Sequence, residues 1–144
     1  MENTLSYLLR SVSMKYRHYA YNVLGKDRWG VSKDLALYHI AQNKKLSQKD
    51  LANKLNVTPA SVSVIVHQME SEGLLVRIPD ERDGRQVNVL LTEKGQNLVP
   101  RVKNSWSEIQ EKITSGLHES ERATLLHLLQ KVEKNIDELT LQNY

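Results

Sequence analysis

The sequence contains no cysteine. This absence excludes disulfides, thiolate zinc sites, iron–sulfur clusters and thiol-based redox sensing. Phenylalanine is also absent and aromatic residues make up only 6% of the chain, so leucine, valine and isoleucine must supply most of the core. No apolar run approaches the ~20 residues that a membrane helix needs, and the N-terminal segment lacks the apolar core of a signal peptide. We therefore expect a cytoplasmic protein with no cofactor, no metal and no membrane partner.

The composition is that of a single folded domain. The chain has 144 residues, of which 40% are hydrophobic, so it can bury a core of its own. The formal net charge is +3 and the isoelectric point is near 9.1. This mildly basic balance permits a nucleic-acid partner but does not establish one.

Apolar periodicity predicts helices toward both ends of the chain. Steps of three and four residues over 4–25 indicate a first helix that ends near Gly25, and a second short helix is expected over 31–42. Thr92 caps a fifth helix, in which Pro100 should produce a kink or a late regular start. A sixth helix carries apolar residues at the spacing of a coiled-coil seam. These are Leu125, Leu129, Val132, Ile136 and Leu139.

Two further helices are expected in the middle of the chain, separated by a tight turn. Ser47 can cap the first of them. The turn falls at Asn56. Thr58 is a good N-cap for the second helix, and Pro59 loses no hydrogen bond at the first helical position. This helix should run to about residue 72 and end at Gly73.

The side chains of these two central helices fit a helix-turn-helix. Small Ala52 allows a close crossing, and the short turn holds the second helix at a steep angle to the first. The space between them is filled by Leu51, Leu55, Val57 and Val62. The second helix keeps small or hydrogen-bonding groups on its outer side and at its tip, as a DNA major groove requires. They are Thr58, Pro59, Ala60, Ser61, Ser63, His67 and Gln68.

The pattern then changes from helical to alternating. Residues 74–78 and 86–91 are expected to form two short strands around a polar hairpin loop, with Gly84 at a likely turn position. Val87, Val89 and Leu91 would share one face of the second strand. The predicted fold class is therefore mainly α, a winged helix-turn-helix with a small β-hairpin. The apolar stripes of the N- and C-terminal helices are most simply buried in a homodimer.

Three segments in this order resemble the MarR family, the multiple-antibiotic-resistance type regulators. They are the helix-turn-helix that begins at Ser47, the segment 72–77, and the Asp83-Gly84-Arg85 loop, which is followed by 91–95. The resemblance covers essentially the whole chain. It implies one domain over 1–144, with a winged DNA-binding part at about 31–91 and dimerisation helices at about 1–26 and 92–144. It further implies a transcription regulator, most simply a repressor released by a small-molecule effector.

The resemblance also implies roles for individual residues. The helix Thr58–Gln68 would enter the major groove, and Arg85 would enter the minor groove with Asp83 fixing its guanidinium. Family members often carry arginine where this chain has Val64, so base preference does not transfer. Val64 could instead touch a thymine methyl group. The predicted DNA-binding residues are Ser47, Gln48, Thr58, Pro59, Ala60, Ser61, Ser63, Val64, His67, Gln68, Arg77, Arg82, Asp83 and Arg85.

Three of these assignments have an alternative interpretation. Arg77 could be structural, with its stem packed along the wing. Arg82 is equally compatible with a DNA contact and with a solvated loop. The Asp83–Arg85 pair could be an ordinary turn ion pair of little energetic value.

The expected partners are double-stranded DNA, a second copy of the chain and a small aromatic or anionic effector. The DNA would be a pseudo-palindromic operator with half-sites roughly one helical turn apart. An aromatic pocket could involve Tyr7, Tyr16, Tyr19, Trp29 and Tyr38. The candidate effector ligands are Arg10, Tyr16, Arg17 and His39. The alternative is that these residues belong to the core or to an interface.

Two other classes of protein remain as alternatives. A winged fold can also serve as a ligand-independent protein-docking module, and DNA binding would be distinguished from it by a steep salt dependence. An enzyme is disfavoured because no nucleophile–base pair or metal-ligand cluster is visible in the sequence.

Overall fold

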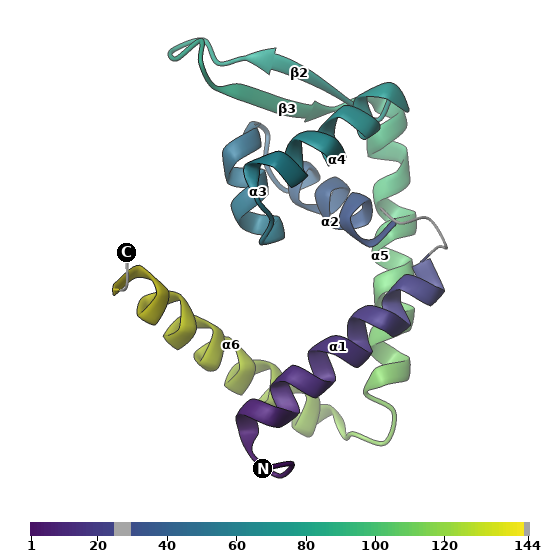
Figure 1. Cartoon of the computed structure of the whole chain (residues 1–144). Coiled ribbons are helices and arrows are strands. Elements are labelled where there is room, and N and C mark those ends of the chain that lie inside the picture. The colour runs from purple at the N-terminus through teal and green to yellow at the C-terminus, as the bar shows by residue number, and fades with distance from the viewer. Residues whose placement is uncertain (25–29, 143–144) are drawn as a thin grey trace. The chain divides into compact units, whose positions relative to one another are not determined.

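The computed structural model describes residues 1–24 and 30–142, and the chain divides into two compact units, Met1–Ile109 and Gln110–Tyr144. The expected helix end at Gly25, and the aromatic Trp29, lie outside the described residues. Within the described residues, no helix has both the length and the apolar character needed to cross a lipid bilayer. The elements are α1 (Leu5–Leu24), α2 (Gly30–Ala41), β1 (Leu46–Ser47), α3 (Gln48–Leu55), α4 (Pro59–Ser71), β2 (Leu75–Pro79), β3 (Val87–Leu91), α5 (Glu93–Ile113) and α6 (Glu119–Gln142) (Figure 1).

The helix-turn-helix forms as the sequence predicts. Ser47 caps α3, because its Oγ accepts a hydrogen bond from the Asp50 N–H at 3.0 Å. Asn56 ends the helix in the left-handed conformation with φ 53°, which asparagine tolerates better than most residues. The Val57 N–H then bonds the Ala52 carbonyl at 3.1 Å. This compact turn sends the chain into α4.

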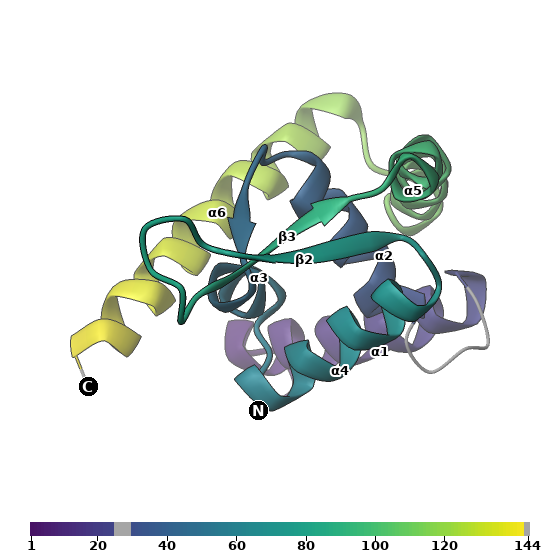
Figure 2. The same ribbon diagram turned by 90° about the horizontal axis from the view of Figure 1, so that it is seen from above.

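The wing is part of a three-stranded antiparallel sheet with the order β1-β3-β2. The two expected strands are present as β2 and β3, with Arg77 opposite Val89 and Ile78 opposite Asn88. Figure 2 shows β2 and β3 side by side, with their connecting loop at the end away from α5. Leu46 and Ser47 add the short strand β1 on the other side of β3, which the sequence analysis did not anticipate. The central strand β3 is therefore tied to the start of α3.

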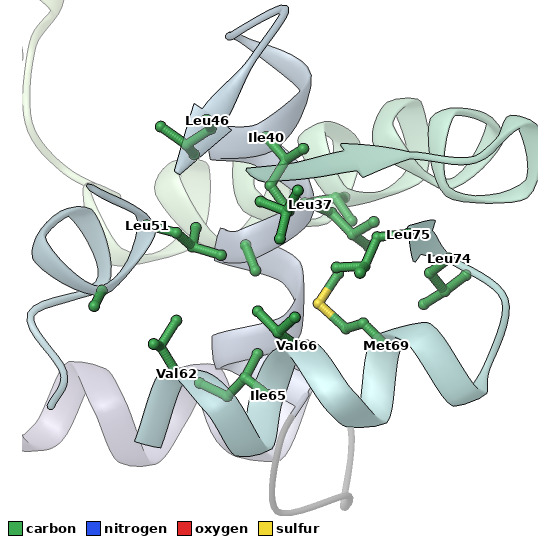
Figure 3. Packing of buried hydrophobic residues seen from close by; sticks show 14 residues of the cluster. Leu37, Ile40, Leu46, Leu51, Val62, Ile65, Val66, Met69, Leu74 and Leu75 are labelled. Atoms are coloured by element: carbon green, nitrogen blue, oxygen red, sulfur yellow. The ribbon is translucent and has the colours of Figure 1, made fainter. Parts of the chain in front are cut away.

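One apolar cluster holds the winged unit together (Figure 3). Leu37 from α2, Leu51 from α3, Met69 from α4 and Leu75 from β2 are at most 1% exposed. Burying such a side chain fully stabilises the fold by about 1.5–3 kcal/mol. Leu55 and Val57 pack against this cluster at its edge, as expected. The cluster fixes α4 against α3 and the sheet.

The fifth helix begins at Glu93 and continues through Pro100 to Ile113. The late regular start that was one of two expectations is therefore wrong. Thr92 explains the early start, because its Oγ1 accepts the Gly95 N–H at 3.2 Å and donates to the Gly73 carbonyl at 2.6 Å. The cap thus also attaches the start of α5 to the end of α4.

The second unit contains the end of α5 and the helix α6. No residue of α6 is buried. Its exposed apolar side chains include four of the five predicted seam residues, and the fifth, Val132, is half-buried. The exposed seam residues are Leu125, Leu129, Ile136 and Leu139.

Candidate nucleic-acid interface

The helix α4 starts with a complete cap. Thr58 Oγ1 accepts the Ser61 N–H at 3.1 Å and donates to Ser61 Oγ at 3.0 Å. Pro59 occupies the first turn, where its missing N–H costs no hydrogen bond. The predicted cap is confirmed. These contacts order the tip of the helix while Thr58 and Pro59 remain exposed.

The helix α4 has one buried side and one exposed side along its length. Val62, Ile65, Val66 and Met69 are at most 2% exposed and face the core (Figure 3). The predicted DNA-binding positions lie on the opposite side or at its margin. Ala60, Ser63, Val64 and His67 are exposed, and Ser61 and Gln68 are half-buried. This outer side offers hydroxyl, methyl and imidazole groups, which suit base edges in a major groove.

The first residue of α3 contacts the middle of this outer side. Gln48 Nε2 donates to Ser63 Oγ at 3.0 Å. The other amide atom, Gln48 Oε1, is buried and has no hydrogen-bond partner among the described residues. This bond fixes the rotamer of Ser63 with respect to α3.

The wing loop carries Arg85 into solvent. Its side chain is 97% exposed, and its Nε lies 3.9 Å from Asp83 Oδ1. The same oxygen accepts the Arg85 N–H at 3.1 Å. The expected Asp83–Arg85 pair is therefore present, but its long and exposed geometry contributes little to stability. Asp83 orders the backbone of Arg85 and leaves the guanidinium accessible.

A surface hollow of about 420 Å³ brings the three elements together. It is lined by Ser47 and Gln48 from the start of α3, Pro59 and Ser63 from α4, and Arg85 from the wing loop, among others. Five of the predicted DNA-binding residues thus border one concavity. All of its lining residues belong to the first compact unit.

Arg77 takes a different position from the other predicted residues. Its Nε and Nη2 donate to the Glu70 carboxylate, with the closest contact at 2.9 Å. The hydrogen bond and charge of Arg77 lower the pKa of Glu70, and Glu70 raises that of Arg77. This bidentate pair joins the last turns of α4 to β2. The structural interpretation of Arg77 is therefore supported by geometry.

A polar cluster that the sequence pattern did not predict lies at the base of the wing loop. Asp80 accepts hydrogen bonds from the Arg82 and Asp83 backbone N–H groups, from Asn88 and from Lys45. Asn88 is the one buried polar side chain among the described residues, at 2% exposure. An asparagine in an otherwise apolar central strand is the sequence signal that could have revealed this cluster.

The four candidate effector ligands are not joined to one another. In the described part of the chain, no hydrogen bond or ion pair links Arg10, Tyr16, Arg17 and His39. Burial raises the pKa of Tyr16, whose ring centroid lies 6.2 Å from that of Trp106. Burial and the charge of Lys54 lower the pKa of His39. His39 is therefore a neutral hydrogen-bonding group near pH 7.

The part of the chain that the structure describes contains no group of three or more histidine, aspartate or glutamate side chains arranged to hold a metal ion. Two crossed helices with a hydrogen-bonding outer side and a hairpin beside them define a winged helix-turn-helix protein.

Comparisons with known proteins agree with this class. The model of the MarR family matches residues 35–86. The regulator BilQ of Clostridium symbiosum is 28% identical over 136 residues, which cover 93% of each chain. BpsR of Bordetella bronchiseptica has a TM-score of 0.83 at 21% identity, over 92% of this chain and 95% of that one. A MarR mutant from E. coli, solved with operator DNA, has a TM-score of 0.77 at 24% identity, over 89% and 92%.

The matched model and these relatives support a MarR-family winged helix-turn-helix transcription regulator. The predicted family and fold class are thereby confirmed. Its relatives are transcription regulators and not enzymes. Members of this family bind DNA.

Proposed function

We propose that the protein is a homodimeric repressor that binds a specific pseudo-palindromic operator. The observation that carries this proposal is the single surface formed by the outer side of α4, the start of α3 and Arg85. The operator-bound MarR mutant supports it as a fold-level analogy. A repressor of this kind would act by occluding a promoter.

In the proposed complex, α4 lies in the major groove. Ser61, Ser63, His67 and Gln68 would offer hydrogen bonds to base edges, and Val64, at 49% exposure, would contact a thymine methyl group. Ser47, Gln48, Thr58, Pro59 and Ala60 would approach the DNA backbone through the helix ends. Arg85 would enter the minor groove, where narrow A·T-rich DNA attracts a guanidinium. Arg82 would contact phosphate from the same loop.

Homodimerisation is supported by apolar surface that the isolated chain leaves exposed. In α1, Leu5 and Val12 are 63% and 62% exposed. In α6, Leu126 and Leu139 are 60% and 59% exposed. Exposed large apolar side chains that recur along a helix are typical of interaction surfaces. A second copy that covers both helices would also supply the second recognition helix for a two-fold operator.

A small aromatic acid is the proposed effector. The DNA binding of the structural neighbour BpsR is regulated by 6-hydroxynicotinic acid. In this chain, Tyr16 supplies an aromatic face, and Arg10 and Arg17 supply positive charge. His39 would act as a neutral hydrogen-bonding group because its pKa is lowered. Release requires the effector to bind a non-operator state of the dimer more tightly than the operator-bound state.

The direct test is a titration of the operator, isolated by in vitro selection or from upstream DNA, with excess nonspecific competitor present. We expect Arg85→Ala to weaken operator affinity by about 1–3 kcal/mol, or roughly 5- to 150-fold, while the protein stays folded and dimeric. Arg101→Ala is the control, because Arg101 is an exposed arginine outside the proposed surface. Equal losses for the two variants would contradict the role of the wing.

The dimer is tested separately. Leu129→Asp combined with Val132→Asp places two charges on the α6 seam and should give monomers in light scattering coupled to size exclusion. Helical content by circular dichroism should be retained. A variant that remains dimeric would show that this part of α6 lies outside the interface.

A further inference from the structure

The wing loop has no apolar anchor of its own. Residues 81–86, from Glu81 to Gln86, are all exposed. A loop of this kind normally samples many conformations, and ordering it on binding costs conformational entropy. The carboxylate of Asp80, whose side chain is only 16% exposed, restrains the loop.

Four hydrogen-bond donors converge on this carboxylate. Oδ1 accepts the backbone N–H groups of Arg82 at 2.9 Å and Asp83 at 3.1 Å. Oδ2 accepts Asn88 Nδ2 at 2.9 Å and lies 3.1 Å from Lys45 Nζ. One oxygen therefore binds the loop, and the other binds the sheet and the segment before β1.

The contacts continue from Asp80 to Arg85. Asp83, whose N–H is held by Asp80, accepts the Arg85 N–H on its own Oδ1 at 3.1 Å. The Asp80 N–H also bonds the Gln86 carbonyl at 2.9 Å and closes the loop. The buried anchor Asn88 lies on the central strand, opposite Ile78. A continuous set of hydrogen bonds thus leads from the core of the sheet to the backbone of Arg85.

We propose that Asp80 is the residue that positions the wing for DNA, because its carboxylate holds the loop in the conformation that presents Arg85. This inference rests on the proposed function, in which Arg85 enters the minor groove. Asp80 itself acts through the loop and does not touch DNA. Preorganisation of this kind increases affinity by removing part of the ordering cost from the binding step.

Loss of the Asp80 carboxylate is expected to change DNA affinity in the direction opposite to that expected from charge alone. Removing a negative charge from a DNA-binding loop normally strengthens attraction to phosphate. Removing Asp80 would also release Lys45 from its ion pair. Charge alone therefore predicts tighter operator binding for a neutral residue at position 80. If the Asp80 carboxylate positions the wing loop, the same substitution should weaken operator binding.

Asp80→Asn is the informative variant, because it keeps the shape of the side chain. All four partners of Asp80 are donors. An asparagine has one amide oxygen, which can accept, and one amide nitrogen, which cannot. The nitrogen must therefore face either the two loop N–H groups or the Asn88 and Lys45 side chains, so half of the four contacts are lost. The matched control is Glu81→Gln. Glu81 is the exposed neighbour and makes no hydrogen bond or ion pair with the described residues, and its substitution removes the same charge.

The experiment measures operator affinity for wild type, Asp80→Asn, Glu81→Gln, Arg85→Ala and the double variant Asp80→Asn/Arg85→Ala. We expect Asp80→Asn to weaken binding on the order of five- to tenfold and Glu81→Gln to bind as well as wild type or better. The double variant should bind no more weakly than Arg85→Ala alone. Hydrogen exchange at the Arg82 and Asp83 amides should accelerate in Asp80→Asn and stay unchanged in Glu81→Gln.

Several outcomes would overturn the inference while leaving the proposed function intact. One is Asp80→Asn binding as tightly as wild type or more tightly. Another is additive losses in the double variant, which would mean that Asp80 acts independently of Arg85. Unchanged amide exchange would show that the carboxylate does not order the loop. Failure of the wild-type protein to bind any selected DNA would instead refute the proposed function, and this inference with it.

Discussion

Gly95 lies in the first turn of α5, at the joint where this helix meets the end of the recognition helix α4. A Cβ atom at this position would overlap the carbonyl oxygen of Leu74. That oxygen also accepts the Thr92 N–H at 3.0 Å. Lys94 Nζ also donates a hydrogen bond to the Glu72 carbonyl, at 2.8 Å. Gly95→Ala should therefore separate the two helices at a place where backbone groups, and not flexible side chains, must move.

The expected change in the free energy of unfolding for Gly95→Ala follows from three effects. Alanine is favoured over glycine inside a helix by about 1 kcal/mol. Overpacking against fixed atoms costs about 3 kcal/mol at the upper end of its range, and weakening the Thr92–Leu74 hydrogen bond costs about 1 kcal/mol more. The net expectation is a loss of about 3 kcal/mol in the free energy of unfolding. For a domain near this size, that loss lowers Tm by about 6–12 °C.

The assay is urea and thermal unfolding at a fixed protomer concentration, because dimerisation makes apparent stability depend on concentration. Gly84→Ala is the control, since no atom lies within 4 Å of a Cβ built there and its φ is not positive. Its effect should stay within about 0.5 kcal/mol. If Gly95→Ala were as stable as wild type, the close packing of α5 on Leu74 would be refuted.

Three further predictions concern the helix cap, the Arg77 pair and the Asp80 carboxylate. Thr58→Ala removes the cap of α4 and should cost about 1 kcal/mol in urea unfolding; an unchanged midpoint would contradict the capping role. Arg77→Ala and Glu70→Ala should lower Tm non-additively, with Arg77→Lys rescuing only partly, because an ammonium group cannot reproduce the bidentate contact; additive effects would exclude the pair. The hydrogen bond from Asn88 is the largest of the contributions that hold the pKa of Asp80 well below its usual range. The stabilisation that ionised Asp80 gives to the fold is therefore present above the ordinary aspartate pKa and lost as pH falls toward the lowered value. Carboxyl NMR shifts should accordingly show Asp80 still ionised at pH 4.

The helix boundaries of the winged unit follow from residues whose local chemistry is decisive. Ser47 and Thr58 have oxygens that satisfy the free N–H groups of a first turn, and Asn56 accepts a positive φ. These effects act over three or four residues, so they can be read without knowledge of the fold. The expectation that Pro100 would delay the regular start of α5 was wrong, because the cap at Thr92 and its attachment to Gly73 fix the start of the helix. That attachment is a tertiary contact.

The elements that sequence reasoning missed depend on contacts between distant segments. The strand β1 has only two residues, which is too short for any alternating pattern, and it exists because Leu46 and Ser47 pair with β3. In the sequence, Asp80 is only one of several charges in a polar loop. Its role becomes visible when the fold places Lys45 and Asn88 beside it. The exposed side of α4 was predictable because it is local, whereas the base of the wing was not.

The distribution of charge gives a reason why order in the wing matters to the proposed function. The helix α4 contains no lysine or arginine, and residues 80–86 carry three carboxylates against two guanidinium groups. Net charge therefore does not draw this loop to phosphate. An arginine in such a loop favours DNA only when it is held forward while the carboxylates are occupied elsewhere. Asp80 is occupied by four donors, and Asp83 is turned to the Arg85 backbone. The same contacts that order the loop thus keep these two carboxylates engaged within the protein and leave the guanidinium of Arg85 97% exposed.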